Sequence, residues 1–161
     1  MLDTTSLWII VIIVILLPFL WNIRSFFVRI SGSWYEEKEE TRTIQMIQLR
    51  QIGPVIWGIA KVNGGQLRYS GWFNGKELKI RRKDFGKNYL ASLGFPKEVL
   101  RELDGSEMAR MIFQYDPIKK ELKGKHFPQK IEISRTRPPK IMQRIYLPAR
   151  SRTWTKTKPH H

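Results

Sequence analysis

The stretch that decides the fold runs from Val55 to Lys83 and reads VIWGIAKVNGGQLRYSGWFNGKELKIRRK. It holds three short runs rich in β-branched and aromatic residues, which favour strands: Val55–Val62, Gln66–Phe73 and Glu77–Lys83. Two turn signals separate these runs, Asn63-Gly64-Gly65 and Asn74-Gly75, and Asn-Gly between alternating runs is the strongest short-range signal for a β-hairpin. The stretch therefore predicts three antiparallel strands joined by tight turns.

Within these runs the residues alternate between two faces, with the period of two that a strand requires. In the second run one face carries Leu67, Tyr69, Gly71 and Phe73, and the other carries Arg68, Ser70 and Trp72. In the third run Leu78 and Ile80 oppose Lys79 and Arg81. One face is thus apolar and the other basic, which favours an antiparallel sheet packed on a core by one side.

The same rhythm continues on both sides of this stretch. Further runs with the strand pattern are Ser33–Glu37, Thr41–Arg50, Met108–Tyr115, Lys120–Phe127 and Lys130–Arg137. A break in the alternation at Met46-Ile47 indicates a β-bulge or a strand covered on both faces. Phe95–Gly105 interrupts the strands as a short helix, with Pro96 in its first turn. We predict a mainly β protein whose seven or eight antiparallel strands close into a small barrel.

An uncharged apolar segment lies near the N-terminus. Leu7–Trp21 reads LWIIVIIVILLPFLW, and twenty residues in a row, from Thr4 to Ile23, carry no charge. At about 1.5 Å per residue, a helix of this length matches the ~30 Å hydrocarbon core of a bilayer. No positive residue precedes the segment, whereas Arg24 and Arg29 come after it, which favours a cytoplasmic location for the rest of the chain. We predict a single transmembrane helix in the cell inner membrane, with the C-terminal domain in the cytoplasm.

The overall charge indicates an anionic partner. Of 161 residues, 29 are Lys or Arg and 14 are Asp or Glu, so that the formal net charge is +15. Such an excess suits acidic lipid head groups, nucleic acid or a phosphate-bearing ligand, and it does not choose among them. The absence of cysteine favours a reducing compartment.

These features divide the chain into three parts. Residues 1–30 are expected to be the membrane anchor with its juxtamembrane segment, residues 31–137 the β-barrel domain, and residues 138–161 a basic tail. No acidic residue comes after Glu132, and the four prolines of the tail argue against a long helix. Two interpretations of the tail stay open. It is either a solvated terminus or a polybasic segment held on lipid or RNA by Ile141, Met142, Tyr146 and Trp154.

Signals for catalysis are nearly absent from the sequence. It contains no cysteine for a thiolate, no H-E-x-x-H, no G-x-S-x-G and no G-x-x-x-x-G-K-[ST] loop. We interpret His126 as a strand-face residue rather than a catalytic base, and the acidic cluster from Glu36 to Glu40 as a solvated turn rather than a metal site. We therefore expect a protein that is not an enzyme, with no metal site and no cofactor.

Binding residues are expected among the aromatic and arginine side chains of the strands. A small barrel can hold one ligand against aromatic walls, and guanidinium groups bind phosphate oxygens in pairs. The residues selected as ligand-binding are Arg50, Trp57, Arg68, Tyr69, Trp72 and Arg110, with Trp34, Arg81, Arg82 and Tyr115 as further candidates. Arg110 shares a strand face with Met108 and Ile112, so it either extends out to water or has an anionic partner inside.

Several short motifs mark the starts and ends of the strands. They are Gly32-Ser33-Trp34-Tyr35, Gln51-Ile52-Gly53, Tyr69 to Gly71, Leu122-Lys123-Gly124, and Ile131-Glu132-Ile133 with Arg135. This pattern resembles lipocalin-like barrels. Together with an N-terminal membrane helix, it is similar to the membrane-anchored β-barrel effectors of bacterial anti-phage cyclic-nucleotide signalling. The resemblance implies a cytoplasmic barrel that binds a cyclic oligonucleotide and drives an assembly that compromises the inner membrane.

Two functions are left as hypotheses. The first is a membrane-anchored binding module for an anionic small ligand, such as a cyclic-nucleotide second messenger, which acts through its helix and through homo-oligomers. The second is a structural or assembly subunit that anchors a complex to the lipid bilayer, with a basic tail that contacts lipid head groups or nucleic acid.

Overall fold

A computed structural model describes residues 27–38 and 43–158 of the chain. The strands in these ranges are β1 (Gly32–Lys38), β2 (Thr43–Ile52), β3 (Val55–Val62), β4 (Gly65–Phe73), β5 (Glu77–Phe85), β6 (Ser106–Asp116), β7 (Glu121–Ile133), β8 (Ile141–Tyr146) and β9 (Arg150–Thr155). Between β5 and β6 come the helical segments α3 (Lys87–Ser92), η1 (Lys97–Val99) and α4 (Leu100–Leu103). The predicted membrane span, Leu7–Trp21, lies outside the described residues. Among the helices within those residues, none is long and apolar enough to cross a bilayer.

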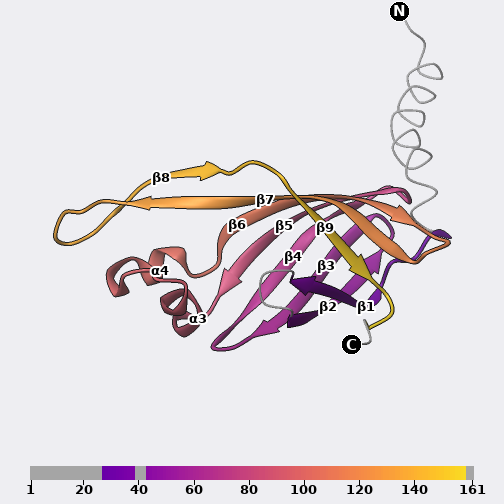
Figure 1. The fold of residues 1–161 in the computed structure, drawn as a ribbon, viewed down its shortest axis with the longest axis horizontal. Coiled ribbons are helices and arrows are strands. Elements are labelled where there is room, and N and C mark those ends of the chain that lie inside the picture. The colour runs from indigo at the N-terminus through magenta and orange to yellow at the C-terminus, as the bar shows by residue number, and fades with distance from the viewer. Residues whose placement is uncertain (1–26, 39–42, 159–161) are drawn as a thin grey trace, which may run out of the picture.

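Eight strands close into an antiparallel barrel (Figure 1). Each strand from β1 to β6 pairs with the next, β6 pairs with β7, and β9 lies between β7 and β1. β8 stands outside this ring and pairs with the second half of β7, from Gln129 to Ile133. The predicted mainly β fold and the predicted closed antiparallel barrel are therefore confirmed. Closure gives every strand in the ring a paired neighbour on both sides, which removes the long free edges of an open sheet.

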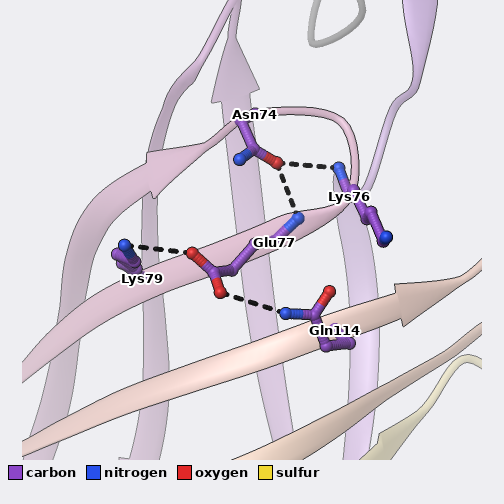
Figure 2. Close-up of polar contacts among 5 residues, drawn as sticks. All are labelled: Asn74, Lys76, Glu77, Lys79 and Gln114. Carbon is purple, nitrogen blue, oxygen red and sulfur yellow. Dashed lines mark hydrogen bonds and ion pairs between the residues drawn. The ribbon is translucent and has the colours of Figure 1, made fainter.

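The stretch that decides the fold forms the strands that its sequence predicts. β3 has the predicted limits, and β4 and β5 differ from theirs by no more than two residues at either end. Asn74 holds the β4–β5 turn, because its side-chain oxygen accepts hydrogen bonds from the backbone N–H of Lys76 at 3.0 Å and of Glu77 at 2.7 Å (Figure 2). Gly75 has a φ of 87°, a left-handed conformation that glycine adopts without strain. Local turn chemistry thus sets the ends of these strands.

Neither alternative predicted for the break at Met46-Ile47, a β-bulge or a strand covered on both faces, is found in β2. β1 and β2 stay in continuous register over all seven residues of β1. Burial alternates along β2, with Gln45, Ile47 and Leu49 inside and Met46 exposed. The break in the hydrophobic pattern arises because a polar residue, Gln45, occupies an inward position.

The largest correction concerns the predicted basic tail, residues 138–161. The segment Arg150–Thr155 of this tail forms β9, the strand that completes the barrel. It pairs with β7 over six residue positions and with β1 over two. Trp154, a predicted surface contact of the tail, is fully buried in the core. Strand pairing outweighs the charge of this segment, because a gap in the barrel would leave two rows of unpaired backbone groups.

β7 and β8 form an arm that projects beyond the barrel (Figure 1). The two runs predicted as separate strands, Lys120–Phe127 and Lys130–Arg137, join into the single strand β7. Three isoleucines of the arm pack on the buried residues of α3, η1 and α4: Ile131, Ile133 and Ile141. The arm therefore supports the helical segments, and Ile141 packs on them.

The predicted helix at Phe95–Gly105 corresponds to η1 and α4. Pro96 precedes the first turn as its cap instead of lying within it. The segment is broken into two short pieces, and the sequence did not predict α3, which precedes them. These pieces are too short to be stable alone, so packing of Leu90, Leu100 and Leu103 in one apolar cluster holds them.

The barrel interior is apolar and aromatic where the chain enters it. Trp34 donates a hydrogen bond from Nε1 to the carbonyl of Ile30 at 2.7 Å. Its ring meets that of Tyr115 edge-on, with the ring centroids 6.2 Å apart. Phe113 and Trp154 lie 4.6 Å apart between their ring centroids. These large rings belong to one buried core cluster inside the barrel.

Candidate functional site

The structure places the six predicted ligand-binding residues on two sides of the barrel wall. Tyr69 faces inward and is buried. The other five lie on the outer face of β2 to β6: Arg50, Trp57, Arg68, Trp72 and Arg110. Arg50 and Trp57 are cross-strand neighbours, and the same row continues through Ser70 and Arg81 to Arg110. The prediction thus selected an outer surface together with a single interior residue.

A hollow of about 610 Å³ lies on this outer face, where β4, β5 and β6 meet the base of the arm. It brings together Trp72 and Arg110, and Arg81, Phe127 and Tyr146 complete much of its wall. Arg68 does not belong to it, since its guanidinium covers the Phe85 ring at 4.3 Å. The hollow has the aromatic walls of a binding site, so the charge of its arginines decides what it can hold.

These arginines are already paired with a carboxylate. Arg110 Nε lies 2.6 Å from Glu107 Oε1, and the Arg110 guanidinium lies over the Tyr146 ring at 4.6 Å. Arg81 Nη1 lies 3.9 Å from Glu107 Oε2, and the Tyr146 hydroxyl donates to Glu107. Burial raises the pKa of Glu107, but the hydrogen bonds from Tyr146 and Arg110 outweigh burial and lower it. Arg110 therefore extends outward, and the outer hollow carries its own anion, which weakens it as a site for an anionic ligand.

A second polar group lies inside the barrel, where charged residues are rare unless paired. Arg82 and Asp84 lie two residues apart on β5 and so share its inward face. Arg82 Nε lies 2.8 Å from Asp84 Oδ1, and Arg82 Nη2 lies 3.1 Å from Asp84 Oδ2. Burial opposes the charge of Arg82, yet the negative charge of Asp84 prevails and raises the pKa of Arg82. This bidentate pair fixes a guanidinium on the inner wall.

Tyr69 faces the same interior, opposite Arg82 in the register of β4 and β5. Its ring meets that of Trp154 edge-on, with the centroids 5.5 Å apart. Burial raises the pKa of the Tyr69 hydroxyl, and the opposing effect of Arg82 is smaller. Tyr69 therefore stays protonated and presents a hydrogen-bond donor beside an aromatic wall.

His126 on β7 has no hydrogen-bond partner inside the barrel. Its exposed fraction is 7 %, and neither Nδ1 nor Nε2 has a partner among the described residues. Burial, and after it the positive charges of Arg82, Arg152 and Arg150, together lower the pKa of His126 to about 4. The field that disfavours a proton on this ring favours an anion beside it.

Gln45 and Glu36 continue this polar wall across β2 and β1, where they are cross-strand neighbours. Gln45 is buried, and its Nε2 has no partner among the described residues. Glu36 Oε1 lies 3.6 Å from Arg152 Nε on β9. We refer to Gln45, Tyr69, Arg82, His126 and Arg152 as the inner polar group.

The barrel wall opens beside Gln45. β2 and β3 pair only as far as Gln48 and Ile59, although β2 begins at Thr43 and β3 ends at Val62. A hollow of about 770 Å³ occupies this divergence, which we call the lateral gap, and Gln45, Val62 and Tyr89 are among its lining residues. Burial raises the pKa of Tyr89, and Asp84 raises it further, which places Tyr89 close to the Arg82–Asp84 pair. Gln45 is thus the member of the inner polar group that lines the lateral gap.

The inner polar group differs from the outer hollow in its unpartnered groups. Its guanidinium groups are also paired with carboxylates, Arg82 with Asp84 and Arg152 with Glu36. The His126 ring and the Gln45 amide, however, have no partner among the described residues, and a ligand with hydrogen-bonding groups would satisfy them. Across residues 27–38 and 43–158, no group of three or more His, Asp or Glu side chains is placed to hold a metal ion. The arrangement thus suits recognition of a charged, hydrogen-bonding ligand.

Sequence reasoning named Tyr69 and Arg82 but missed the other members of the inner polar group. The position of His126 could have been found, because Leu122, Gly124 and His126 alternate on one face of β7. The broken pattern next to Gln45 was likewise a signal, although it was interpreted as a β-bulge or a strand covered on both faces. Arg152 had no such signal, because its strand was assigned to the tail.

Acidification is expected to destabilise the barrel through His126. The folded pKa of about 4 lies below the ordinary 6.5, so between these values the unfolded chain binds a proton that the folded chain does not. Stability is therefore lost as the pH falls from about 6.5 to about 4, by on the order of 1 to 3 kcal/mol. Urea unfolding across this pH range measures the loss. In His126→Gln the free energy of unfolding should depend less steeply on pH. An unchanged pH dependence would contradict this account of His126.

No family model, no curated protein and no solved structure matches this chain. The case for its function therefore depends on the geometry of the inner polar group.

Proposed function

We propose that this protein is a membrane-anchored β-barrel of the lipocalin-like type that binds a small anionic ligand in its interior. The single observation that carries the proposal is His126, whose two buried ring nitrogens have no partner among the described residues and lie in the positive field of Arg82 and Arg152. Buried polar groups without partners are rare, and each calls for a bound group that satisfies it. An anion with hydrogen-bonding groups would satisfy both the arginine field and the imidazole.

A nucleotide is the ligand class that suits these residues best. Phosphate oxygens match Arg82 and Arg152, the Gln45 amide can pair with a base edge, and Tyr69 offers an aromatic wall. The lateral gap, at about 770 Å³, falls within the range of small-molecule sites, about 300 to 1,000 Å³. We infer that a cyclic-nucleotide second messenger is the first ligand to test, in line with a role as an effector in anti-phage defence.

The seam between β1 and β9 offers a route from the ligand to the membrane anchor. β9 contributes Arg152 to the inner polar group, and β1 continues directly from the N-terminal part of the chain. These strands pair at only two positions, fewer than any other pair in the ring. A ligand that prefers one arrangement of this seam would shift the population of that arrangement, which is sufficient for a switch.

The binding proposal is tested by the titration of His126. The chain has three histidines, so ring-labelled His126 can be assigned in the full-length protein in detergent by comparison with His126→Gln. Inorganic phosphate, mononucleotides and cyclic mono- and dinucleotides are then added in turn. A bound anion should move the His126 midpoint upward from about 4, by about one pH unit or more. If none of these ligands moves the midpoint, the proposed binding site is wrong.

A matched pair of arginine variants distinguishes the interior from the outer face. Arg152→Gln removes a charged donor from the inner polar group, whereas Arg68→Gln removes an exposed arginine that covers Phe85. Hydrogen bonds to charged groups contribute about 1.5 to 3 kcal/mol, so Arg152→Gln should weaken binding by roughly 10- to 100-fold. Arg68→Gln should bind as the unchanged chain does. Equal losses in both variants would place the ligand outside the barrel.

A further inference from the structure

One end of the barrel carries the turns next to the point where the chain enters from its N-terminal side. Because the strands are antiparallel, the β2–β3, β4–β5 and β6–β7 turns all lie at the end where β1 begins. We call this end the N-terminal rim. It consists of residues 27–31, Ile52–Val55, Asn74–Lys76 and Asp116–Lys120.

The N-terminal rim exposes large apolar side chains at its tips. Ile118 is 92 % exposed, Phe27 81 % and Ile52 71 %. Away from this rim, Leu93 near the helical segments is 49 % exposed and Met142 on β8 is 71 % exposed. Isolated exposed apolar residues are ordinary, but a set gathered on the tips of one rim marks an interaction surface.

The position of Ile118 is fixed by its turn. The Asp116 carboxylate accepts hydrogen bonds from the backbone N–H of Ile118 at 2.9 Å and of Lys119 at 3.1 Å. Lys120 has a φ of 53°, a left-handed backbone conformation that residues other than glycine and asparagine rarely adopt. The β6–β7 turn is thus a built structure that presents an isoleucine and two lysines to the outside.

The rim is also positively charged. Arg29, Lys76, Lys119 and Lys120 are all exposed there. Three acidic residues lie nearby. The Glu77 carboxylate lies 3.0 Å from Lys79 Nζ and accepts from Gln114 at 3.0 Å (Figure 2), Asp116 caps its own turn, and Glu121 directly follows Lys120. Lys156 adds a further cation beneath them, since its Nζ donates to the Ser31 carbonyl and lies 5.1 Å from the centre of the Trp34 ring. Exposed apolar tips among cations suit the interface of an anionic bilayer.

The sequence before the rim fits the same partner. The uncharged segment Thr4–Ile23 ends four residues before Phe27. Four residues span at most about 14 Å even when extended. A barrel joined by so short a link to a segment in the bilayer would keep its N-terminal rim at the lipid surface.

We propose that the N-terminal rim docks on the surface of an anionic bilayer. Ile118, Ile52 and Phe27 insert among the lipid head groups, and the lysines of the β6–β7 turn contact lipid phosphates. The lateral gap lies at the opposite end of β2 and β3, so this orientation leaves it open to the aqueous side. The proposal does not depend on what the barrel interior binds.

Single-cysteine labelling of the full chain tests the docking, because the chain has no cysteine of its own. Ile118→Cys and the matched control Leu93→Cys carry an environment-sensitive dye in vesicles of phosphatidylcholine and phosphatidylglycerol that contain a lipid-borne quencher. The emission of the dye at position 118 should shift to the blue and be quenched. The emission of the dye at position 93 should show neither change. Equal quenching at the two sites, or quenching at neither, would overturn the proposal.

The charge part of the proposal has its own test in the same vesicles. Lys119→Glu combined with Lys120→Glu should reduce the quenching at 118 severalfold, and high salt should do the same. Lys97→Glu combined with Arg101→Glu, at the opposite end, should leave it unchanged. If both double variants behave alike, or if vesicles of phosphatidylcholine alone quench the label equally, the proposed attraction between these lysines and anionic head groups is wrong. Ligand titration of His126 is unaffected by either result, so the two proposals fail separately.

Discussion

A chain that ends at Leu147 should not fold into the barrel. Such a chain lacks β9, which pairs with β7 over six positions and with β1 over two. Its loss exposes an edge on each neighbouring strand and removes Trp154 from contact with Phe113 and Tyr69. We expect no cooperative unfolding transition by circular dichroism. If residues 138–161 were only a basic tail, the truncated chain would unfold as the full chain does.

A single substitution tests the role of β9 without shortening the chain. Trp154→Ala in the full chain removes a fully buried ring and should lower the free energy of unfolding by about 3 to 5 kcal/mol. Met142→Ala, on the exposed face of β8, is the matched control and should change it by less than about 0.5 kcal/mol. Urea unfolding measures both variants. Similar small losses for the two would mean that β9 does not belong to the core.

The second large effect is expected at the buried ion pair. Asp84→Leu leaves the Arg82 guanidinium inside the barrel without the carboxylate that now holds it at 2.8 and 3.1 Å. An uncompensated buried charge should lower the free energy of unfolding by about 3 to 5 kcal/mol. Arg82→Met combined with Asp84→Leu removes both charges and should recover most of that loss, because an apolar pair of similar volume often packs as well.

This pair of variants also separates stability from function. The double variant is expected to be folded, and yet it should lose the response of His126 to anions, because a guanidinium of the inner polar group is gone. A double-mutant cycle in urea measures the coupling between Arg82 and Asp84. A coupling near zero would contradict a structural role for the pair. A folded double variant that binds ligand normally would remove Arg82 from the site.

The elements that the sequence predicted best are those set by neighbouring residues. The limits of β3 and most of those of β4 and β5 result from Asn-Gly turns and from a period of two, both of which act within a few residues. The engagement of Asn74 with the backbone of its own turn shows why (Figure 2), since the interaction needs no distant partner. Seven or eight strands with one apolar face were then enough to predict closure.

Only the tertiary structure decided which strand closes the ring and what lies inside it. Arg150–Thr155 forms a strand because it pairs with β1 on one side and β7 on the other. No pattern within these six residues indicates that pairing. In the same way, Arg82 is stable inside the barrel because Asp84 lies on the same strand face. His126 is buried because its face of β7 points into the barrel. Periodicity assigns residues to a face, but whether that face is the inside depends on partners far away in the chain. The sequence therefore determined the strands and their turns, whereas long-range pairing determined the last strand and the polar interior.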